Sequence, residues 1–411
     1  MDAGERFDPT VPFPVRLPAV PNHPTRDDID LCGGAFWAGD HHAALTWMRR
    51  EAPVYFDGAT WGITRYADVK DVSRRTEEFS SAGGIRPAQG PLPQMIDMDD
   101  PDHFQRRKLV NKGFTPRRVR DSEPQVRKAC TEILDAVFER GHADLVGEIA
   151  APLPMIMIGD ALGVRPEHRA ELLRWSDEML QGLATEATEA QLLGAGEAFG
   201  AYNAYAAEVV QARRADPQDD LMSLLVHAEV DGDRLSDEEI VQESLLILIG
   251  GDETTRHVIS GGIHQLLLHP DQWERLAEDP SARPGAVEEM LRWVTPIKNM
   301  VRTATREVEL RGEQIHEGDE LMLLYPSANR DEDVFDDPFR FDIARTPNDH
   351  VAFGFGTHFC LGASLARLEI AVMLDELLTR MPALRVADPD ADVHVRPNNF
   401  ISGLEHLPVE W

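Results

Sequence analysis

HVAFGFGTHFCLGASLARLE, residues 350–369, places one cysteine in a glycine-rich loop just before a predicted helix. The apolar spacing predicts that helix over 363–381, so its free N–H groups and positive end should face the sulfur of Cys360 and favour the thiolate. Glycines in the loop allow the backbone to approach a large, flat group; they are Gly354, Gly356 and Gly362. Cys360 is therefore predicted to act as a ligand, whereas Cys130, within a predicted helix, is interpreted as a small buried hydrophobe.

The spacing around the cysteine fits the pattern F-x-x-G-x-[R/H]-x-C-x-G. In this stretch the sequence resembles the cytochrome P450 superfamily, whose haem iron is held by one proximal thiolate. A zinc site needs more nearby ligands than one Cys and one His. A cysteine hydrolase needs a histidine placed as a base, and His358, two residues away in an extended turn, should point elsewhere. The resemblance implies iron coordination by Cys360 and contacts to haem b from Phe353, Gly354, His358 and Gly362.

A second stretch, LLILIGGDETTRH at residues 245–257, interrupts an apolar helix with polar residues. Ser236 and Glu239 form a capping box at the start of this helix, and Pro270 marks its end. At ~1.5 Å per residue the helix is ~48 Å long, so it should cross the core. Buried acids and hydroxyls are unfavourable unless they find partners. The interruption therefore indicates a functional site.

This interruption resembles the family's [A/G]-G-x-[D/E]-T motif over the distal face of the haem. The resemblance implies that the helix widens at Gly250. It also implies that Glu253 relays protons and that the Thr254 hydroxyl lies beside bound dioxygen.

Two charged residues, Glu289 and Arg292, lie three apart in EEMLR. That spacing alone is common in surface ion pairs. It resembles the family's E-x-x-R motif, which is joined by an arginine ahead of the cysteine loop, here Arg340 in DPFRF. The resemblance implies a buried network that fixes the loop behind the haem, with a structural role.

Partners for the two haem propionates are implied at three places by the same resemblance. MDDPDHFQRRKLV resembles the family's helix that carries His103 and Arg107, four residues apart on one helical face. Arg302 in NMVRTATREVEL and His358 complete the set, and arginine suits carboxylates well. With an unperturbed pKa near ~6.5, His358 should be half-charged near neutral pH.

The remaining periodicity favours helices over about 67–300, with strands on either side. APVYFDGATWGITRY at 52–66 alternates like a β-hairpin, and 306–325 predicts short strands. No flexible linker divides the chain. One large, mainly α domain with a smaller β-rich portion is predicted over 30–411, after a proline-rich segment at 1–29. The resemblance implies the P450 fold, with the haem between the long central helix and the cysteine loop.

The 411 residues carry a formal net charge of −31, which opposes binding to nucleic acid and to anionic membranes. Residues 106–120, however, hold seven Arg or Lys and no acid. Such a run is commonly a solvated face, but on an acidic chain it can dock an acidic partner. The chain has no dinucleotide fingerprint. The resemblance therefore implies electrons from an acidic ferredoxin and its reductase, docking near Arg106, Lys108, Lys112, Arg117 and Arg118.

The cellular compartment is predicted from the cysteines and the N-terminus. Cys32, Cys130 and Cys360 lie far apart, as is usual in a reducing cytosol. The N-terminus has no apolar stretch typical of a signal peptide, and no apolar run has the length of a membrane span. A cytoplasmic location is expected.

The segments implied to contact substrate are apolar and offer no carboxylate clamp, which favours a large lipophilic substrate. Some of their side chains could simply pack in the core. The residues expected to line the pocket are Ile85, Leu92, Met95, Leu246, Ile249, Val294, Ile297, Met300 and Phe400.

Five stretches, among them 80–103 and 288–300, resemble actinobacterial P450 enzymes of steroid catabolism. Those enzymes oxidise the terminal methyl of the cholesterol or cholest-4-en-3-one side chain to the alcohol and often onward to the acid. The alternatives are hydroxylation of branched fatty acids or terpenoid chains. A peroxide-driven peroxygenase would usually lack the acid–alcohol pair at 253–254. A non-enzymatic haem protein would need neither a proton relay nor a large apolar cavity.

Overall fold

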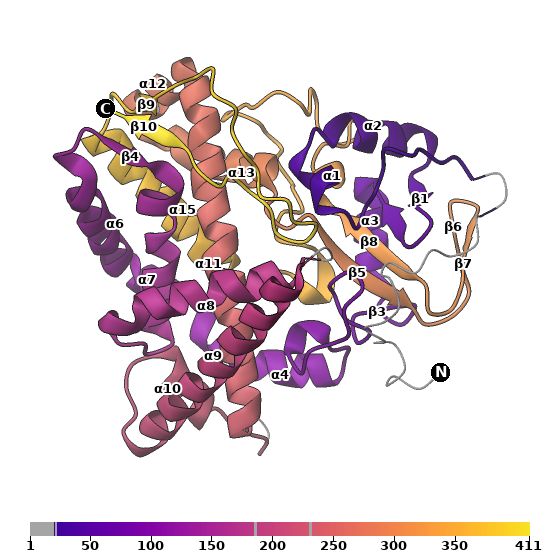
Figure 1. The fold of residues 1–411 in the computed structure, drawn as a ribbon, viewed down its shortest axis with the longest axis horizontal. Coiled ribbons are helices and arrows are strands. Elements are labelled where there is room, and N and C mark those ends of the chain that lie inside the picture. The colour runs from indigo at the N-terminus through magenta and orange to yellow at the C-terminus, as the bar shows by residue number, and fades with distance from the viewer. Residues whose placement is uncertain (1–19, 21–22, 185–186, 230–231) are drawn as a thin grey trace.

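A computed structural model describes residues 20, 23–184, 187–229 and 232–411, so most of the predicted segment 1–29 lies outside the described residues. The helical part surrounds one long central helix, and a sheet lies beside it (Figure 1). None of the described helices is long and apolar enough to cross a membrane. The α-helices are α1 (Gly34–Ala38), α2 (His42–Glu51), α3 (Tyr66–Arg74), α4 (Asp102–Val110), α5 (Pro116–Asp121), α6 (Glu123–Phe138), α7 (Pro152–Ala161), α8 (Arg169–Gly182), α9 (Glu189–Ala215), α10 (Leu221–His227), α11 (Asp237–Leu268), α12 (Pro270–Glu278), α13 (Arg283–Val294), α14 (Tyr325–Ala328) and α15 (Ala363–Arg380).

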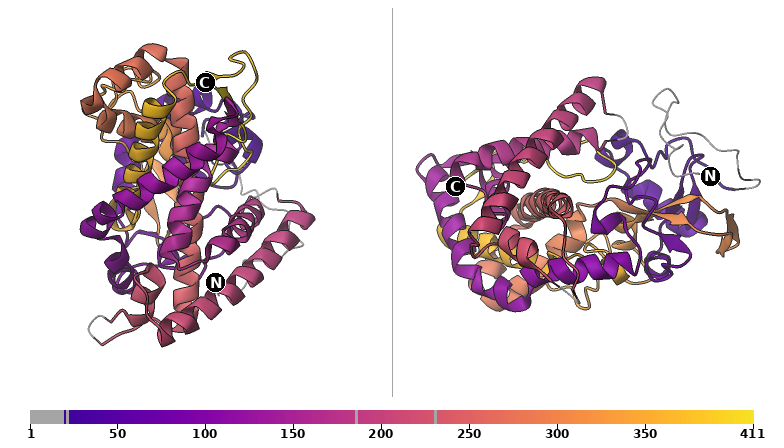
Figure 2. Two further views of the ribbon diagram at one scale, coloured as in Figure 1. Left: turned by 90° about the vertical axis from the view of Figure 1, so that its left-hand side faces the viewer. Right: turned by 90° about the horizontal axis from the view of Figure 1, so that it is seen from below.

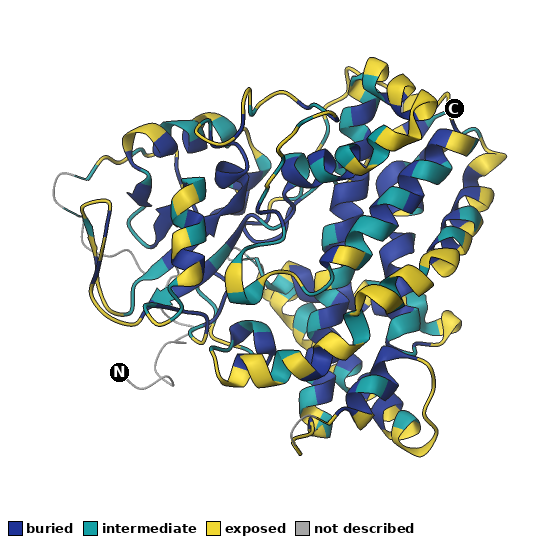
Figure 3. Cartoon of the chain, turned by 180° about the vertical axis from the view of Figure 1, so that it is seen from behind, coloured by how far each residue is buried: buried dark blue, intermediate teal, exposed yellow. Residues whose placement is uncertain are grey.

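The central helix is α11, and its start confirms the predicted capping box. Ser236 Oγ accepts a hydrogen bond from the Glu239 N–H, and the Glu239 side chain accepts one from the Ser236 N–H. Seen end-on in Figure 2, α11 lies among the other helices, and Figure 3 shows its long buried surface. The helix runs without interruption from Asp237 to Leu268, with Gly250 inside it.

The main sheet carries one side of the pocket and has the strand order β1-β2-β8-β5-β3. Val54 pairs with Ile63 in an antiparallel hairpin, which confirms the prediction for 52–66. Two smaller sheets have the orders β4-β10-β9 and β6-β7. The strands are β1 (Val54–Phe56), β2 (Trp61–Ile63), β3 (Phe79–Ser80), β4 (His142–Asp144), β5 (Asn299–Ala304), β6 (Val308–Leu310), β7 (Glu313–Ile315), β8 (Glu320–Leu324), β9 (Arg385–Val386) and β10 (Pro408–Glu410).

A buried ion cluster joins α13 to the segment that leads into the cysteine loop. Glu289 and Arg292 are fully buried and form a two-point ion pair at 2.7 and 2.8 Å. The third member is Arg345, whose Nε lies 3.2 Å from Glu289 Oε2. The side chain of Arg340 is exposed, and only its carbonyl accepts bonds, from Arg292 and Arg345. The expectation for Arg340 is therefore wrong, because that side chain points to solvent.

We expect Arg345→Ala to lower the free energy of unfolding by about 2 kcal/mol, because it leaves the buried Glu289 carboxylate with one charged partner fewer. Arg340→Ala, the matched control at an exposed position, should change it by less than about 0.5 kcal/mol. Urea denaturation of both variants measures the difference. A larger loss for Arg340→Ala would contradict the assignment of Arg345 to the cluster.

Candidate functional site

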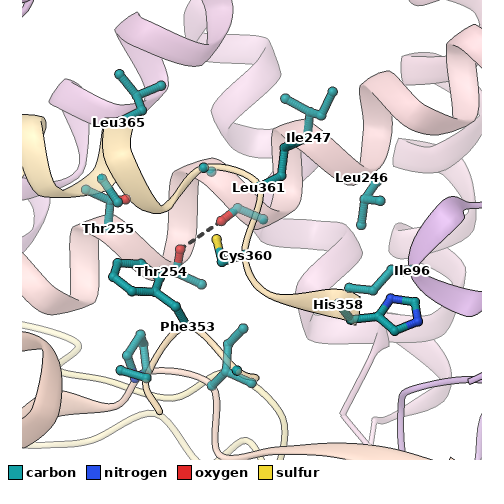
Figure 4. Close-up of a pocket in the computed structure, with 18 of the residues that line it drawn as sticks. Ile96, Leu246, Ile247, Thr254, Thr255, Phe353, His358, Cys360, Leu361 and Leu365 are labelled. Atoms are coloured by element: carbon teal, nitrogen blue, oxygen red, sulfur yellow. Dashed lines mark hydrogen bonds between the residues drawn. The ribbon is translucent and has the colours of Figure 1, made fainter. Parts of the chain in front are cut away.

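The cysteine loop is a tightly constrained turn that ends at α15. The Cys360 N–H donates to the Phe353 carbonyl at 2.9 Å. Gly356 has a φ of +77°, and a Cβ there would lie 2.7 Å from the Ser73 carbonyl oxygen, so this position requires glycine. The Cys360 sulfur opens into a cavity between the loop and α11 (Figure 4). This cavity, lined by Cys360 and Thr254 among others, is called the cysteine chamber below.

Opposing effects act on the Cys360 thiol. Its side chain is exposed to the cysteine chamber but lies deep within the molecule, and this burial raises its pKa. The backbone N–H groups of Gly362 and Ala363, with the charges of Arg107 and Arg367, act in the other direction. The N–H groups therefore face the sulfur as predicted. They favour the thiolate as predicted, but burial outweighs them, so the net effect is a raised pKa for the free thiol.

Phe353 forms the wall of the chamber beside the sulfur. Its ring lies 6.2 Å from that of Phe359, and the Arg367 guanidinium carbon lies 4.5 Å from its centroid. Gly354, next to it, has a φ of +69° and also lines the chamber. This wall leaves the sulfur in an apolar setting, where a metal–thiolate bond is shielded from water.

One corner of the cysteine chamber collects hydrogen-bond donors. His103, Arg107, Arg302 and His358 all line it. Arg302 is buried and makes no ion pair within the described part of the chain. His103 Nε2 is buried and, among the described residues, has no hydrogen-bond partner. The Asp100 carboxylate, 3.2 Å from His103 Nδ1, engages only the other nitrogen of that ring. A corner rich in donors, with an orphaned nitrogen on His103, fits the two propionates of a haem.

The two histidines of this corner lie against each other, with ring centroids 4.2 Å apart. Burial, followed by the charge of Arg302, lowers the pKa of His358 to about 2. His358 is therefore neutral at neutral pH, and the expectation of a half-charged side chain is wrong. A neutral imidazole can still donate one hydrogen bond.

Thr254 and Glu253 take different positions around α11. Thr254 lines the cysteine chamber, and its hydroxyl donates to the Gly250 carbonyl at 2.7 Å (Figure 4). Glu253 is fully buried and is not among the residues that line the chamber. It pairs with Arg256, and its Oε2 lies 3.4 Å from Nη1 of Arg396, which is 28% exposed. Glu253 therefore lies between the chamber wall and a partly exposed cation.

Two further acids, Asp252 on α11 and Glu369 on α15, were missed by the sequence analysis. Both are buried, and Glu369 lines the cysteine chamber. Burial, followed by the charge of Asp252, raises the pKa of Glu369 to about 8. Burial also raises the pKa of Asp252. Asp252 could have been predicted as a functional acid, because it lies inside the GGDET stretch that interrupts the apolar helix.

A second chamber adjoins the first and extends toward the connection between α8 and α9. Seven residues line both chambers, and this shared lining is called the neck below: Ile85, Ile96, Leu246, Gly250, Thr254, Ile297 and Met300. Leu92, Ile249 and Phe400 line the second chamber, and Met95 lines the first. Val294 lines neither chamber, because its side chain packs against α11 at Gly261. The structure thus brings together all the expected pocket residues except Val294.

Of the basic residues expected to dock a partner, Arg106 is turned inward. It pairs with Glu239 and, at 3.1 Å, with the fully buried Glu243. Arg106 lies on the side of α4 that faces α11, so the expectation that it docks a partner protein is wrong. Lys112, Arg117 and Arg118 are exposed or partly exposed, with Arg118 paired to Asp219 at 2.9 Å.

The fold and the cysteine chamber define a haem-thiolate protein, and the chain belongs to the cytochrome P450 family, whose sequence model matches residues 191–282 and 284–390. Its relatives include a steroid C26-monooxygenase of Mycobacterium tuberculosis, 53% identical over 93% of this chain and 96% of that protein. A methyl-branched lipid omega-hydroxylase of the same species is 38% identical over 93% of this chain and 95% of that protein.

Solved structures agree with this assignment. CYP109E1 of Bacillus megaterium in complex with testosterone superposes with a TM-score of 0.83 at 34% identity, over 90% of this chain and 99% of that one. The P450 PksS of Bacillus subtilis gives 0.85 at 32% identity, over 93% and 99%. The predicted class of fold is confirmed, and the chain is a P450 monooxygenase.

Glu369→Gln should make the protein less sensitive to alkaline pH. Folding raises the pKa of Glu369 from about 4.5 to about 8, so the folded state keeps a proton that the unfolded state has lost, and stability falls as the pH rises between these values. Glutamine cannot ionise. The melting temperature of the variant relative to wild type should therefore rise by about 3 °C or more across this window.

The control is Glu208→Gln, at an exposed position of α9. This control should show no pH-dependent difference from wild type in thermal unfolding followed by circular dichroism. If Glu369→Gln behaved like the control, the Glu369 carboxyl would be ionised in the folded protein at neutral pH, and burial would not have raised its pKa.

Proposed function

We propose that this chain hydroxylates the terminal methyl of a sterol side chain, that of cholesterol or cholest-4-en-3-one, in steroid catabolism. The observation that carries the proposal is the 53% identity to steroid C26-monooxygenases over nearly the whole chain. The two-chamber cavity, with its apolar lining, supports the same substrate class. The working unit is the single domain 30–411, acting in the cytoplasm.

Haem b is the proposed cofactor, held by the Cys360 thiolate and by propionate contacts from His103, Arg107, Arg302 and His358. When bound, it supplies the activation of dioxygen and the insertion of one oxygen atom into a C–H bond. The chain must bind the cofactor by its acidic edge, exclude water from the sulfur, and deliver protons and substrate to the opposite face. The donor corner and the Phe353 wall suit the first two tasks.

Proton delivery is assigned to Glu253 and Thr254. Glu253 lies against Arg256 and Arg396, and Arg396 is partly exposed, so protons have a polar route from solvent to the back of α11. The Thr254 hydroxyl lines both chambers, where it can exchange its bond to the Gly250 carbonyl for one to a bound oxygen ligand. The proposal therefore requires the Glu253 side chain to leave its cationic partners and turn toward the neighbouring Thr254 hydroxyl.

Attack at a terminal methyl requires steric control, because internal and tertiary C–H bonds are weaker. The neck between the chambers is lined by bulky apolar side chains such as Ile85, Ile297 and Met300, whereas Gly250 leaves an opening on the α11 side. A slender chain end can pass this neck while a fused ring system stays in the second chamber. In this proposal the end of the sterol side chain faces the cysteine chamber.

We expect the holoenzyme, supplied with NADPH, a ferredoxin and its reductase, to oxidise cholest-4-en-3-one at its terminal methyl. Under the same conditions a methyl-branched fatty acid should react at least about ten times more slowly, a difference of about 1.4 kcal/mol. Mass spectrometry of the products with each substrate measures both. Faster oxidation of the fatty acid would overturn the sterol proposal in favour of lipid omega-hydroxylation, and product formed equally well from peroxide alone would favour a peroxygenase.

The electron donor is proposed to be an acidic ferredoxin that docks beside the cysteine loop. α4 lies against this loop, because Arg107 donates to the Phe359 carbonyl. Around this contact Phe104 and Phe359 are 61% and 43% exposed, and Lys108, Lys112, Arg117 and Arg118 lie on the same segment. Apolar side chains ringed by cations form a suitable surface for a small anionic protein.

Charge reversal tests this surface. Changing Lys108, Lys112 and Arg118 to Glu should slow reduction by ferredoxin about tenfold or more at low salt, and leave substrate binding unchanged. The control reverses Arg165, Arg174 and Arg306, which are exposed on other elements, and has the same net charge. Stopped-flow reduction compares the two, and equal rates would dismiss the docking surface.

A further inference from the structure

A polar cluster lies in the wall of the otherwise apolar second chamber. Among the described residues that line this chamber, the polar side chains are Arg86, Gln94 and Thr254. Thr254 belongs to the neck shared with the cysteine chamber. Arg86 and Gln94 line only the second chamber, on the loop between β3 and α4. Both side chains therefore face the second chamber and not the cysteine chamber.

The cluster is buried and held in place by many contacts. Arg86 Nη1 donates to Asp97 Oδ2 at 2.8 Å, and Nη2 donates to Gln94 Oε1 at 3.3 Å. Asp97 also accepts from the Ile85 and Leu92 N–H groups at 3.0 and 2.8 Å. Arg86, Gln94 and Asp97 are 6%, 1% and 4% exposed. The guanidinium is therefore fixed before any ligand arrives.

This arrangement leaves donor capacity unused. A guanidinium carries five N–H donors, and the structure gives Arg86 two hydrogen bonds; its Nε has no partner among the described residues. A buried donor left unsatisfied lowers the stability of the folded protein. An acceptor oxygen brought in by a ligand would recover part of that stability after a small shift of the side chain.

The charge of the cluster limits which acceptor fits. Asp97 already neutralises Arg86, so a carboxylate would add an uncompensated buried charge, which is costly in an apolar chamber. A ketone or hydroxyl oxygen can accept a hydrogen bond without that penalty. The ring of Phe400, whose centroid lies 6.0 Å from the Arg86 guanidinium carbon, offers a flat apolar surface next to the donors.

We propose that Arg86 is a specificity residue that donates a hydrogen bond to a neutral oxygen on the substrate's ring system, at the end remote from the oxidised methyl. The inference rests on the proposed function, since it assumes a substrate whose chain end enters the cysteine chamber. The enzyme then recognises both ends of its substrate, the ring oxygen in the second chamber and the chain end in the cysteine chamber. Neutral 3-oxygenated sterols are selected over hydrocarbons of the same shape and over fatty acid anions.

The test compares cholest-4-en-3-one with cholest-4-ene, which lacks the ring oxygen. Each is titrated into the holoenzyme, and binding is followed by the shift of the haem absorption toward high spin. Wild type should bind cholest-4-en-3-one about tenfold more tightly than cholest-4-ene, because one hydrogen bond worth about 1.4 kcal/mol corresponds to a tenfold change in affinity. In Arg86→Met the ratio of the two affinities should fall to about one. Arg86→Lys, which keeps a donor, should retain part of the preference for the ketone.

The control variant is Arg49→Met, which removes another buried arginine, paired with Glu332 and outside both chambers. It should keep the full preference for the ketone. Equal affinities for the two sterols in wild type would overturn the inference even if no Arg86 variant folded, and would leave the sterol proposal intact. A preference that survives in Arg86→Met would also overturn it. If neither sterol bound, the sterol proposal itself would fail.

Discussion

The sulfur of Cys360 has to be held at one point in space, inside a cavity, by the loop that carries it. The loop achieves this with a backbone hydrogen bond to Phe353 and with a glycine at 356 that no other residue can replace. Behind the loop, the Glu289–Arg292–Arg345 cluster joins α13 to the segment that leads into the cysteine loop. On the other side, α15 supplies N–H groups to the sulfur, and α11 closes the cavity.

Polar groups of different kinds lie in different parts of this cavity. Donors gather at the His103–Arg302 corner, and acids lie behind and beside α11. The described lining of the second chamber is apolar apart from Arg86, Gln94 and Thr254. In a medium of low dielectric constant, a polar or charged group without a partner loses much solvation free energy. Their separation allows one pocket to bind an acidic cofactor edge, move protons and accept a lipophilic chain.

Features set by local sequence were predictable. The capping box at Ser236, the hairpin at 52–66 and the helix after Cys360 depend on neighbours within a few residues, and all three are present. Features that depend on the direction of a side chain could not be predicted from the sequence. Arg340 and Arg345 both lie shortly before the cysteine loop in sequence, and only the backbone path decides which side chain reaches Glu289. In the same way, α11 turns Glu253 away from the chamber, and α4 turns Arg106 toward α11.

The central claim is that Cys360 binds haem iron as a thiolate, and the carbon monoxide spectrum of the reduced protein tests it most directly. We expect an absorption maximum at the long-wavelength position typical of thiolate ligation, and we expect it to disappear when Cys360 is replaced by alanine. A maximum at the position of histidine-ligated haem in wild type, or the thiolate position retained in Cys360→Ala, would contradict the claim.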